Sequence, residues 1–317
     1  MSTSPLVING TEVLPGERKI INLNIASLPS RTPIDIPIHI FRSKKEGPTM
    51  LLLAGMHGDE AGGIEIIRRI ISDARMKRLL KGTVMAIPIL NMYGFLNYSR
   101  EVPDGKDVNR SFPGNRAGSL ASRVTWHFAH EIMQFADYII DFHTGGASRS
   151  NYPQVRCVLD RGPIEEMAVA MGAPFVINAN LRDRSLRWYA TKKGIPALVY
   201  EAGESLRFDE HAISEGVDSA FRFMKHLKMI SKAPQSNNVT ILRRSGWIRA
   251  KSAGLFRPFV ESGEKVRKGT IIGTISGPFG DYNKNVRAKE SGYIIAVNHM
   301  PVINQGDALF HMGYVSV

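Results

Sequence analysis

Residues 50–63 read MLLLAGMHGDEAGG, and this stretch decides how the rest of the sequence is interpreted. Its apolar start is typical of a strand that is buried on both faces. The strand runs out into a glycine-flanked turn that contains His57 and Glu60. An amphipathic segment typical of a helix follows as far as Ile71. A strand, a turn and a helix in this order predict one unit of an α/β fold, with the turn at one edge of the sheet.

The same alternation of short apolar runs and longer amphipathic segments continues to about residue 200. The expected strands are MLLLAG, TVMAIPIL, DYIIDFH, RCVLD, PFVINA and ALVYEAG. The expected helices are 60–71, 117–135, 163–171, 185–193 and 210–229. This pattern favours an α/β domain with a parallel or mixed sheet. The weaker alternation before residue 45 predicts edge strands of the same domain, one of which would hold His39 half-exposed.

The segment 231–238, SKAPQSNN, has the composition of a linker, and we predict a domain boundary there, between residues 1–230 and 239–317. After it the helical patterns stop and short apolar runs are separated by glycines, which predicts a small all-β module. Two segments, starting at Gly254 and Gly292, repeat one pattern that resembles the biotinyl/lipoyl-type β-sandwich. The joining segment SGPFGDYNKN has no lysine at its tip, and Lys284 lies beyond it, so we expect a structural cap and no cofactor carrier.

Composition narrows the class of protein. With 43% hydrophobic and 22% charged residues, the chain has the composition of a globular protein. It has no apolar run of membrane-spanning length and no signal-peptide pattern at the start, so it is expected to be cytoplasmic. The single cysteine, Cys157, excludes an intrachain disulfide and is expected to be buried in a strand. A net charge of +12 favours anionic partners. Because the basic residues form no dense runs, a small acidic substrate is favoured over nucleic acid.

Three side chains of metal-ligand type end apolar strands, where side chains from different strands converge. His57 and Glu60 lie in the first turn, and His143 lies in DYIIDFHTGG. Two imidazoles and one carboxylate make the open three-ligand set of a catalytic zinc ion. The His-x-x-Glu pair alone is weak, since such residues are more often caps or surface groups. Asp141 shares a strand face with His143 and is expected to orient it.

Further motifs follow in order along the chain. DVNRSFPG, residues 107–114, offers Asn109 and Arg110, and a guanidinium can bind a carboxylate through two parallel hydrogen bonds. Arg100 is a second arginine of this kind; for both, pairing with a surface acid is the plainer alternative. Glu201 ends the apolar run PALVYEAG and is the expected general base, with Glu204 as the fallback.

Together these motifs resemble the aspartoacylase and succinylglutamate desuccinylase family of the zinc-carboxypeptidase-like group. The resemblance covers about residues 48–230. It implies a three-layer α/β/α sandwich with a mixed sheet, one zinc ion per chain, and hydrolysis of the amide bond of a small N-acyl amino acid by attack of a metal-bound water.

The resemblance also implies roles for particular residues. His57, Glu60 and His143 would bind the metal, Glu201 would act as general base, and Arg100 would polarise the scissile carbonyl. Substrate contacts would come from the four residues Asn109, Arg110, Tyr189 and Lys193. Lys193 stands where the family pattern has an arginine. Asp59 also departs from the pattern and would orient a metal ligand instead.

Two alternatives stay open at this point. A metallocarboxypeptidase that trims acidic residues from a peptide would use the same metal and arginines, and a binding protein with a decayed site would use the β module. The intact ligand set argues against the decayed site. The expected partner is a small anionic N-acyl amino acid or an acidic peptide, with no nucleic acid and no membrane, and a homo-oligomer stays open. The helix residues His127, His130 and Glu131 have the wrong order for a helical zinc motif.

Overall fold

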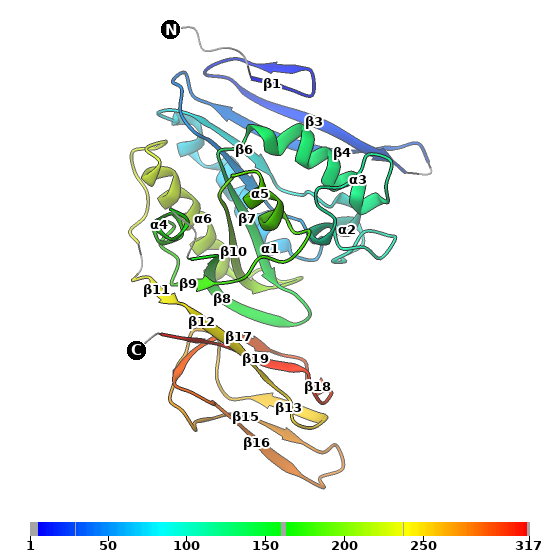
Figure 1. Cartoon of the computed structure of the whole chain (residues 1–317), viewed down its shortest axis with the longest axis vertical. Coiled ribbons are helices and arrows are strands. Elements are labelled where there is room, and N and C mark those ends of the chain that lie inside the picture. Colours follow the sequence, from blue (N-terminus) through cyan, green and yellow to red (C-terminus); the bar gives the residue numbers. More distant parts are fainter. Residues whose placement is uncertain (1–5, 29, 160–162, 237, 316–317) are drawn as a thin grey trace.

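The computed structural model describes residues 6–28, 30–159, 163–236 and 238–315. Figure 1 shows an upper lobe of strands and helices and a lower lobe formed by the C-terminal strands. Residues 1–5 lie outside the described residues, and they belong to the segment in which no signal peptide is predicted. Asp160 of RCVLD and residue 237 of the predicted linker also lie outside them. No helix among the described residues is both long enough and apolar enough to span a membrane.

Within the described residues, thirteen strands form one large mixed sheet that runs through both lobes. Its order on the main path is β12-β19-β17-β8-β10-β7-β5-β6-β4-β3. Eight of its strands come from the first lobe: β3 (Arg18–Ser27), β4 (Pro33–Arg42), β5 (Thr49–Leu53), β6 (Thr83–Ile87), β7 (Tyr138–Gly145), β8 (Arg149–Cys157), β9 (Phe175–Asn178) and β10 (Ala197–Glu204). β6, β5, β7 and β10 pair in parallel, whereas β4 and β8 join antiparallel on either side. The predicted mixed sheet is therefore confirmed.

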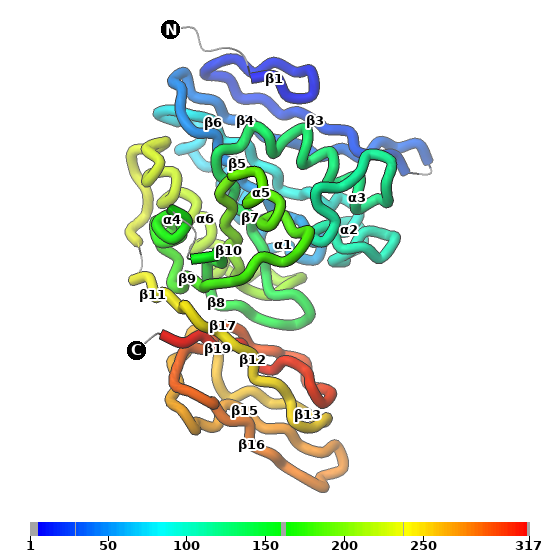
Figure 2. Tube along the Cα trace, in the orientation of Figure 1, coloured from blue at the N-terminus to red at the C-terminus, as the bar shows by residue number. Residues whose placement is uncertain are grey.

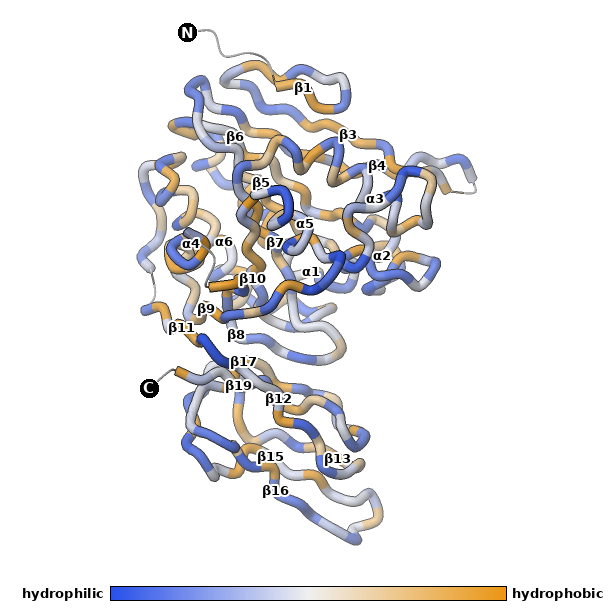
Figure 3. Tube along the Cα trace, viewed as in Figure 1, coloured by the Kyte–Doolittle hydropathy of each residue, from blue (hydrophilic) through white to orange (hydrophobic). Residues whose placement is uncertain are grey.

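Helices cover both faces of this sheet. On one face lie α1 (Ala61–Ser72), α4 (Ile164–Ala170) and α6 (Glu210–His226), and on the other lie α2 (Met92–Leu96), α3 (Leu120–His127) and α5 (Leu186–Lys192). Alternate residues of the central strands belong to different hydrophobic cores: Leu51 packs on the side of α3 and α5, and Leu52 on the side of α1 and α6. This explains why the central strands are apolar throughout. Figure 3 shows hydrophobic residues gathered on these strands.

The helices and most of the strands predicted for residues 48–230 are found close to their predicted bounds. The strand predicted at RCVLD was placed wrongly: β8 spans Arg149–Cys157, because most of its residues lie in the stretch that precedes this apolar run. The segment 117–135 is less regular than predicted, because α3 continues as a π-helical turn (Phe128–Ile132) and a 3₁₀ turn (Met133–Phe135). Cys157 is fully buried in β8, and His39 is half-buried in β4, both as predicted. A short hairpin of β1 (Leu6–Ile8) and β2 (Thr11–Val13) precedes the large sheet.

After residue 239 the described chain forms strands and no helix. β11 (Thr240–Leu242) pairs with β9, while β12 (Arg244–Arg249), β17 (Gly292–Asn298) and β19 (Ala308–Tyr314) extend the large sheet, with β17 paired to β8. β14 (Lys265–Val266) pairs with β17. A second sheet holds β13 (Gly254–Pro258), β15 (Ile271–Ser276), β16 (Asn283–Arg287) and β18 (Val302–Ile303). The tube in Figure 2 shows these strands folding back on one another. Their buried apolar side chains form a hydrophobic core of their own.

The turn after β5 depends on glycines. Gly55 adopts a φ of 58°, in the left-handed region that favours glycine. At Gly58 an added Cβ would lie 1.8 Å from the carbonyl carbon of Gly94, while the amide of Gly58 donates to the carbonyl oxygen of Ser99. The turn that contains His57 is thus packed tightly against α2 and the segment that follows it.

We expect Gly58→Ala to destabilise the protein by about 1–3 kcal/mol or more, because the backbone of Gly94 and Phe95 must move to admit the methyl group. Gly246→Ala is the matched control, since an added Cβ there meets nothing within 4 Å. Urea unfolding of both variants measures the difference. Equal stability of the two variants would show that the turn is not tightly packed.

Candidate functional site

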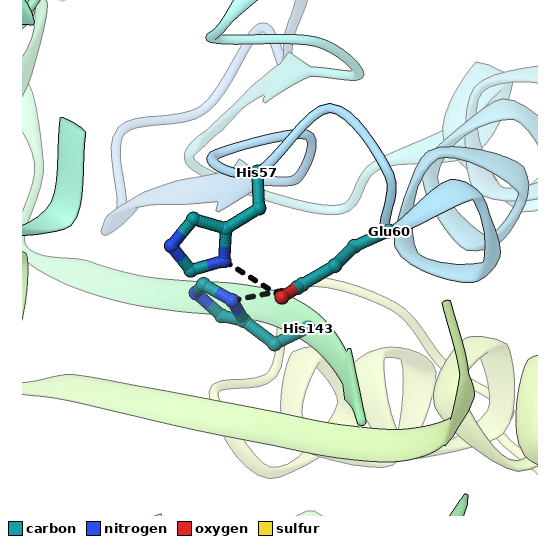
Figure 4. A group of neighbouring side chains, drawn as sticks. All are labelled: His57, Glu60 and His143. Atoms are coloured by element: carbon teal, nitrogen blue, oxygen red, sulfur yellow. Dashed lines mark hydrogen bonds and ion pairs between the residues drawn. The ribbon is translucent and has the colours of Figure 1, made fainter. Parts of the chain in front are cut away.

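Two neighbouring parallel strands bring the candidate metal ligands together. His57 and Glu60 lie in the turn between β5 and α1, and His143 lies near the end of β7, the strand paired with β5. Because the carboxyl ends of parallel strands meet at one edge, residues 86 positions apart become neighbours. Figure 4 shows the three side chains pointing toward one another.

The geometry of the three side chains suits a metal ion. Each imidazole turns its Nδ1 atom toward the carboxylate of Glu60, at 2.7 Å from His57 and 2.8 Å from His143. All three residues are buried, and their ligand atoms lie within 4.8 Å of one another. Three such ligands leave a further position for water or substrate around a tetrahedral ion. Among the described residues this is the one group of His, Cys, Asp and Glu side chains with such geometry.

The far nitrogen of each imidazole meets a second carboxylate. The Nε2 atom of His143 lies 2.8 Å from Asp141, and that of His57 lies 3.3 Å from Asp107. A proton on each Nε2 would therefore be donated to a carboxylate, which leaves both Nδ1 atoms as ligands. Asp141 was predicted for this position, whereas Asp107 was missed, although it belongs to the DVNRSFPG motif.

Electrostatics favour charged forms of these groups despite their burial. Burial is the largest single effect on the pKa of Glu60 and would raise it. The combined attraction of His57 and His143 is stronger, so the pKa of Glu60 is lowered. For His143, burial lowers the pKa, yet Asp141 and Glu60 together raise it well above its usual value. Protons would therefore compete with a metal ion for the imidazole nitrogens, so acid should weaken metal binding.

Arg100 lies at the rim of this group. Its Nη2 atom donates to Asp107 at 2.8 Å, and its Nη1 atom lies 3.2 Å from Nδ1 of His57. The Asp107 carboxylate is thus shared between an arginine and an imidazole. Burial acts to raise the pKa of Asp107, but its contacts with His57 and Arg100 lower it. This ion pair holds the guanidinium beside the metal ligands.

Glu201 lies on β10, one strand beyond His143, and the two residues are register partners. Its Oε2 atom accepts a hydrogen bond from Asn151 at 3.0 Å and pairs with Arg156 at 2.6 Å. Both partners come from β8 and were missed, because no local pattern marks them. Glu204 lies elsewhere: it lines a small cavity with Gly62 and other residues on the side of α1 and α6.

The predicted substrate contacts lie around a loop next to α5. Asn109 accepts a hydrogen bond on its side-chain oxygen from the backbone of Leu186, at 2.9 Å. Arg110 is exposed and donates to the backbone oxygen of Asn109. Tyr189 is buried and stacks on Phe112, while Lys193 is exposed, with its Nζ atom 5.6 Å from the centre of the Tyr189 ring.

Asp59 makes no side-chain hydrogen bond to either histidine within the described chain, and burial raises its pKa. Asp107 and Asp141 occupy the orienting positions instead. The helix residues set aside in the sequence also stay apart from the centre: His127 pairs with Glu131 at 3.0 Å, and His130 stacks on Trp126.

The chain is thus an α/β protein with a mixed sheet and, at the ends of its parallel strands, a buried His-Glu-His group that could hold a metal ion. The sequence model of the succinylglutamate desuccinylase/aspartoacylase catalytic domain matches residues 46–227. The chain belongs to this family, as its motifs predicted.

Several known proteins resemble the chain over most of its length. It is 26% identical over 296 residues to the N-alpha-acetyl-L-2,4-diaminobutyric acid deacetylase of Halomonas elongata, covering 86% of this chain and 84% of that protein. A succinylglutamate desuccinylase/aspartoacylase from Rhodobacter sphaeroides superposes with a TM-score of 0.82 at 24% identity, over 94% of this chain and 96% of the other. The product-bound ectoine utilization protein EutE of Ruegeria pomeroyi gives 0.83 at 21% identity, over 95% of each. These structures share the fold.

Asp141→Asn should weaken the binding of a divalent metal ion by about 10–100-fold, because the amide no longer fixes the proton of His143 on Nε2. Asp104→Asn, on the exposed loop before Asp107, is the control. Competition with a chelator measures both affinities. Equal affinity in the two variants would mean that Asp141 does not orient the ligand.

Proposed function

We propose that this chain is a zinc-dependent hydrolase that cleaves the amide bond of a small N-acyl amino acid. The observation that carries the proposal is the buried group of His57, Glu60 and His143 with Glu201 on the next strand. The Halomonas relative, named as a deacetylase of an N-acetylated amino acid, supports the same reaction type.

Zinc fits the donor set best. Nitrogen and carboxylate ligands in a three-residue set with a free position are typical of catalytic zinc, whereas magnesium and calcium prefer oxygen ligands. When bound, zinc would lower the pKa of a water molecule to about 7 and polarise the scissile carbonyl. His57, Glu60 and His143 would hold one ion per chain.

The remaining chemistry falls to side chains of the chain itself. Glu201 would accept a proton from the attacking water and return it to the leaving amine. Asn151 and Arg156 engage one oxygen of Glu201, so the other oxygen would carry the proton. Arg100 would donate to the carbonyl oxygen as negative charge develops there.

The substrate carboxylate would be held beside α5. The side-chain oxygen of Asn109 is fixed by Leu186, which would leave its Nδ2 group to donate to the substrate. Arg110 would add a charged donor from its exposed position, with Tyr189 and Lys193 nearby. A metallocarboxypeptidase acting on acidic peptides is the second candidate function, because the same arginines would bind a terminal carboxylate.

We also propose two domains, a catalytic domain over residues 1–230 and a β-sandwich cap of the biotinyl/lipoyl type over residues 239–317. The separate hydrophobic core of the C-terminal strands supports this division. The exposed Phe279 in the turn between β15 and β16 supports a cap without a carrier lysine, since Lys284 lies within β16.

Metal analysis followed by an activity screen tests the proposed function. Purified protein should contain about one zinc ion per chain. Acetyl, succinyl and aspartyl amino acids should be hydrolysed faster than peptides with acidic C-terminal residues. His57→Ala and His143→Ala should lose the metal; full zinc occupancy in both variants contradicts the ligand assignment.

Glu201→Gln should fold and keep its zinc, yet lose turnover by about 10²–10⁴-fold, because the amide cannot accept the proton. Glu204→Gln is the matched control and should change turnover little, since Glu204 lies toward α1 and α6. Steady-state kinetics and metal analysis of both variants measure the effect. Loss of zinc from Glu201→Gln would make Glu201 a metal ligand, and near-normal turnover would exclude it as the base.

A further inference from the structure

A fully buried glutamine lies beside the candidate base. Gln154 in β8 has no exposed surface, and neither its Nε2 atom nor its Oε1 atom has a hydrogen-bond partner among the described residues. Buried polar groups almost always have partners, because leaving one without a partner costs stability. A buried amide without a partner therefore suggests that its hydrogen-bonding groups are reserved for a ligand.

The strand register places this amide on the working face of the sheet. Glu201 is the register partner of His143 on one side and of Gln154 on the other. Directly opposed residues of neighbouring strands project to the same face. With strands about 4.8 Å apart, the backbone of Gln154 lies roughly 10 Å from that of His143. That distance matches the length of a small N-acyl amino acid bound at the metal.

The surroundings of Gln154 are rich in donors and positive charge. Arg156, two residues further along the same face, pairs with Glu201 through Nη2, while its Nε atom has no partner among the described residues. Burial lowers the pKa of Arg187 on α5, and repulsion from the guanidinium group of Arg156 adds to the effect. His311 of β19 is neutral, since burial and then Arg156 lower its pKa to about 3. The carboxylates that act on Arg187 are Glu201 and Asp141, and Asp141 pairs with His143.

We propose that Gln154 and Arg156 form a specificity subsite that binds a carboxylate carried by the substrate beyond the scissile amide. The Nε2 group of Gln154 and the Nε group of Arg156 would donate to its oxygens. Two nearby guanidinium groups would repel an ammonium group at the same place. This inference rests on the proposed function. This carboxylate would belong either to the acyl group or to the side chain of the amino acid.

Matched substrate pairs distinguish these sources in the zinc-loaded protein. N-acetyl-L-glutamate is compared with N-acetyl-L-glutamine, and N-succinyl-L-alanine with its succinamoyl analogue. We expect kcat/KM to favour the carboxylate by about tenfold or more in one pair, the factor that a hydrogen bond to a charged group provides. The pair that shows the preference identifies the source. A preference below twofold in both pairs overturns the proposal.

Gln154→Leu removes both amide atoms at similar size. We expect this variant to keep its fold and zinc, because replacing a buried polar group without a partner is close to neutral, and to lose the carboxylate preference by about tenfold. Gln134→Leu, on the exposed surface, is the matched control and should keep the preference. An unchanged preference in Gln154→Leu would overturn the subsite. If that variant does not fold, Gln154→Glu replaces it and must disfavour the carboxylate substrates.

A binding experiment separates this proposal from the proposed function. If the zinc-loaded protein hydrolyses none of the substrates, the proposed function fails, and the subsite is judged by glutarate alone. Glutarate should raise the Tm of the wild-type protein and of Gln134→Leu, but not that of Gln154→Leu. An equal rise in all three, or no rise in the wild-type protein, overturns the subsite.

Discussion

The hydrogen-bonded register of four neighbouring strands is the constraint on which the site depends. β5, β7, β10 and β8 are fixed side by side, so that the side chains of His143, Glu201 and Gln154 share one face. A slip of one residue in any pairing would turn these side chains toward the opposite core. The apolar residues that alternate with them prevent such a slip, because each of the two cores accepts one set. The same strand pairing therefore determines both the core packing and the geometry of the candidate site.

The polar centre is stable in this apolar frame because its charges are paired. Three carboxylates pair with the two imidazoles, and Arg100 pairs in turn with one of them, Asp107. The three carboxylates are those of Glu60, Asp107 and Asp141. Each Nε2 atom has a carboxylate of its own, so the Nδ1 atoms are turned inward together. A buried charge without such pairing would be costly. The outer carboxylates thus decide which nitrogen is available for an ion.

Much of this arrangement could be predicted from the sequence because its signals are local. The strand-turn-helix at residues 50–63 and the histidine at the end of DYIIDFH predicted the ligand group, since parallel strands end at a common edge. Asn151, Gln154 and Arg156 could not be found in this way. They reach Glu201 only through the antiparallel pairing of β8 with β10, and pairing between distant strands leaves no periodic signal. For the same reason the sequence predicted the C-terminal strands, but not the continuation of the large sheet into them.

That continuation links the face that carries the candidate site to the C-terminal lobe through β8 and β9. β8 pairs with β10 along one edge, and along the other it pairs with β9 and with β17. Without the C-terminal strands, residues 149–151 of β8 would present unpaired backbone groups, and Phe175 and Ile177 would lose the neighbours Leu242 and Ile295 that cover them. An open, apolar strand edge is a template for aggregation. The C-terminal lobe therefore also covers the edge of the large sheet. A chain shortened before this lobe would expose that edge and would tend to cover it by associating with another molecule.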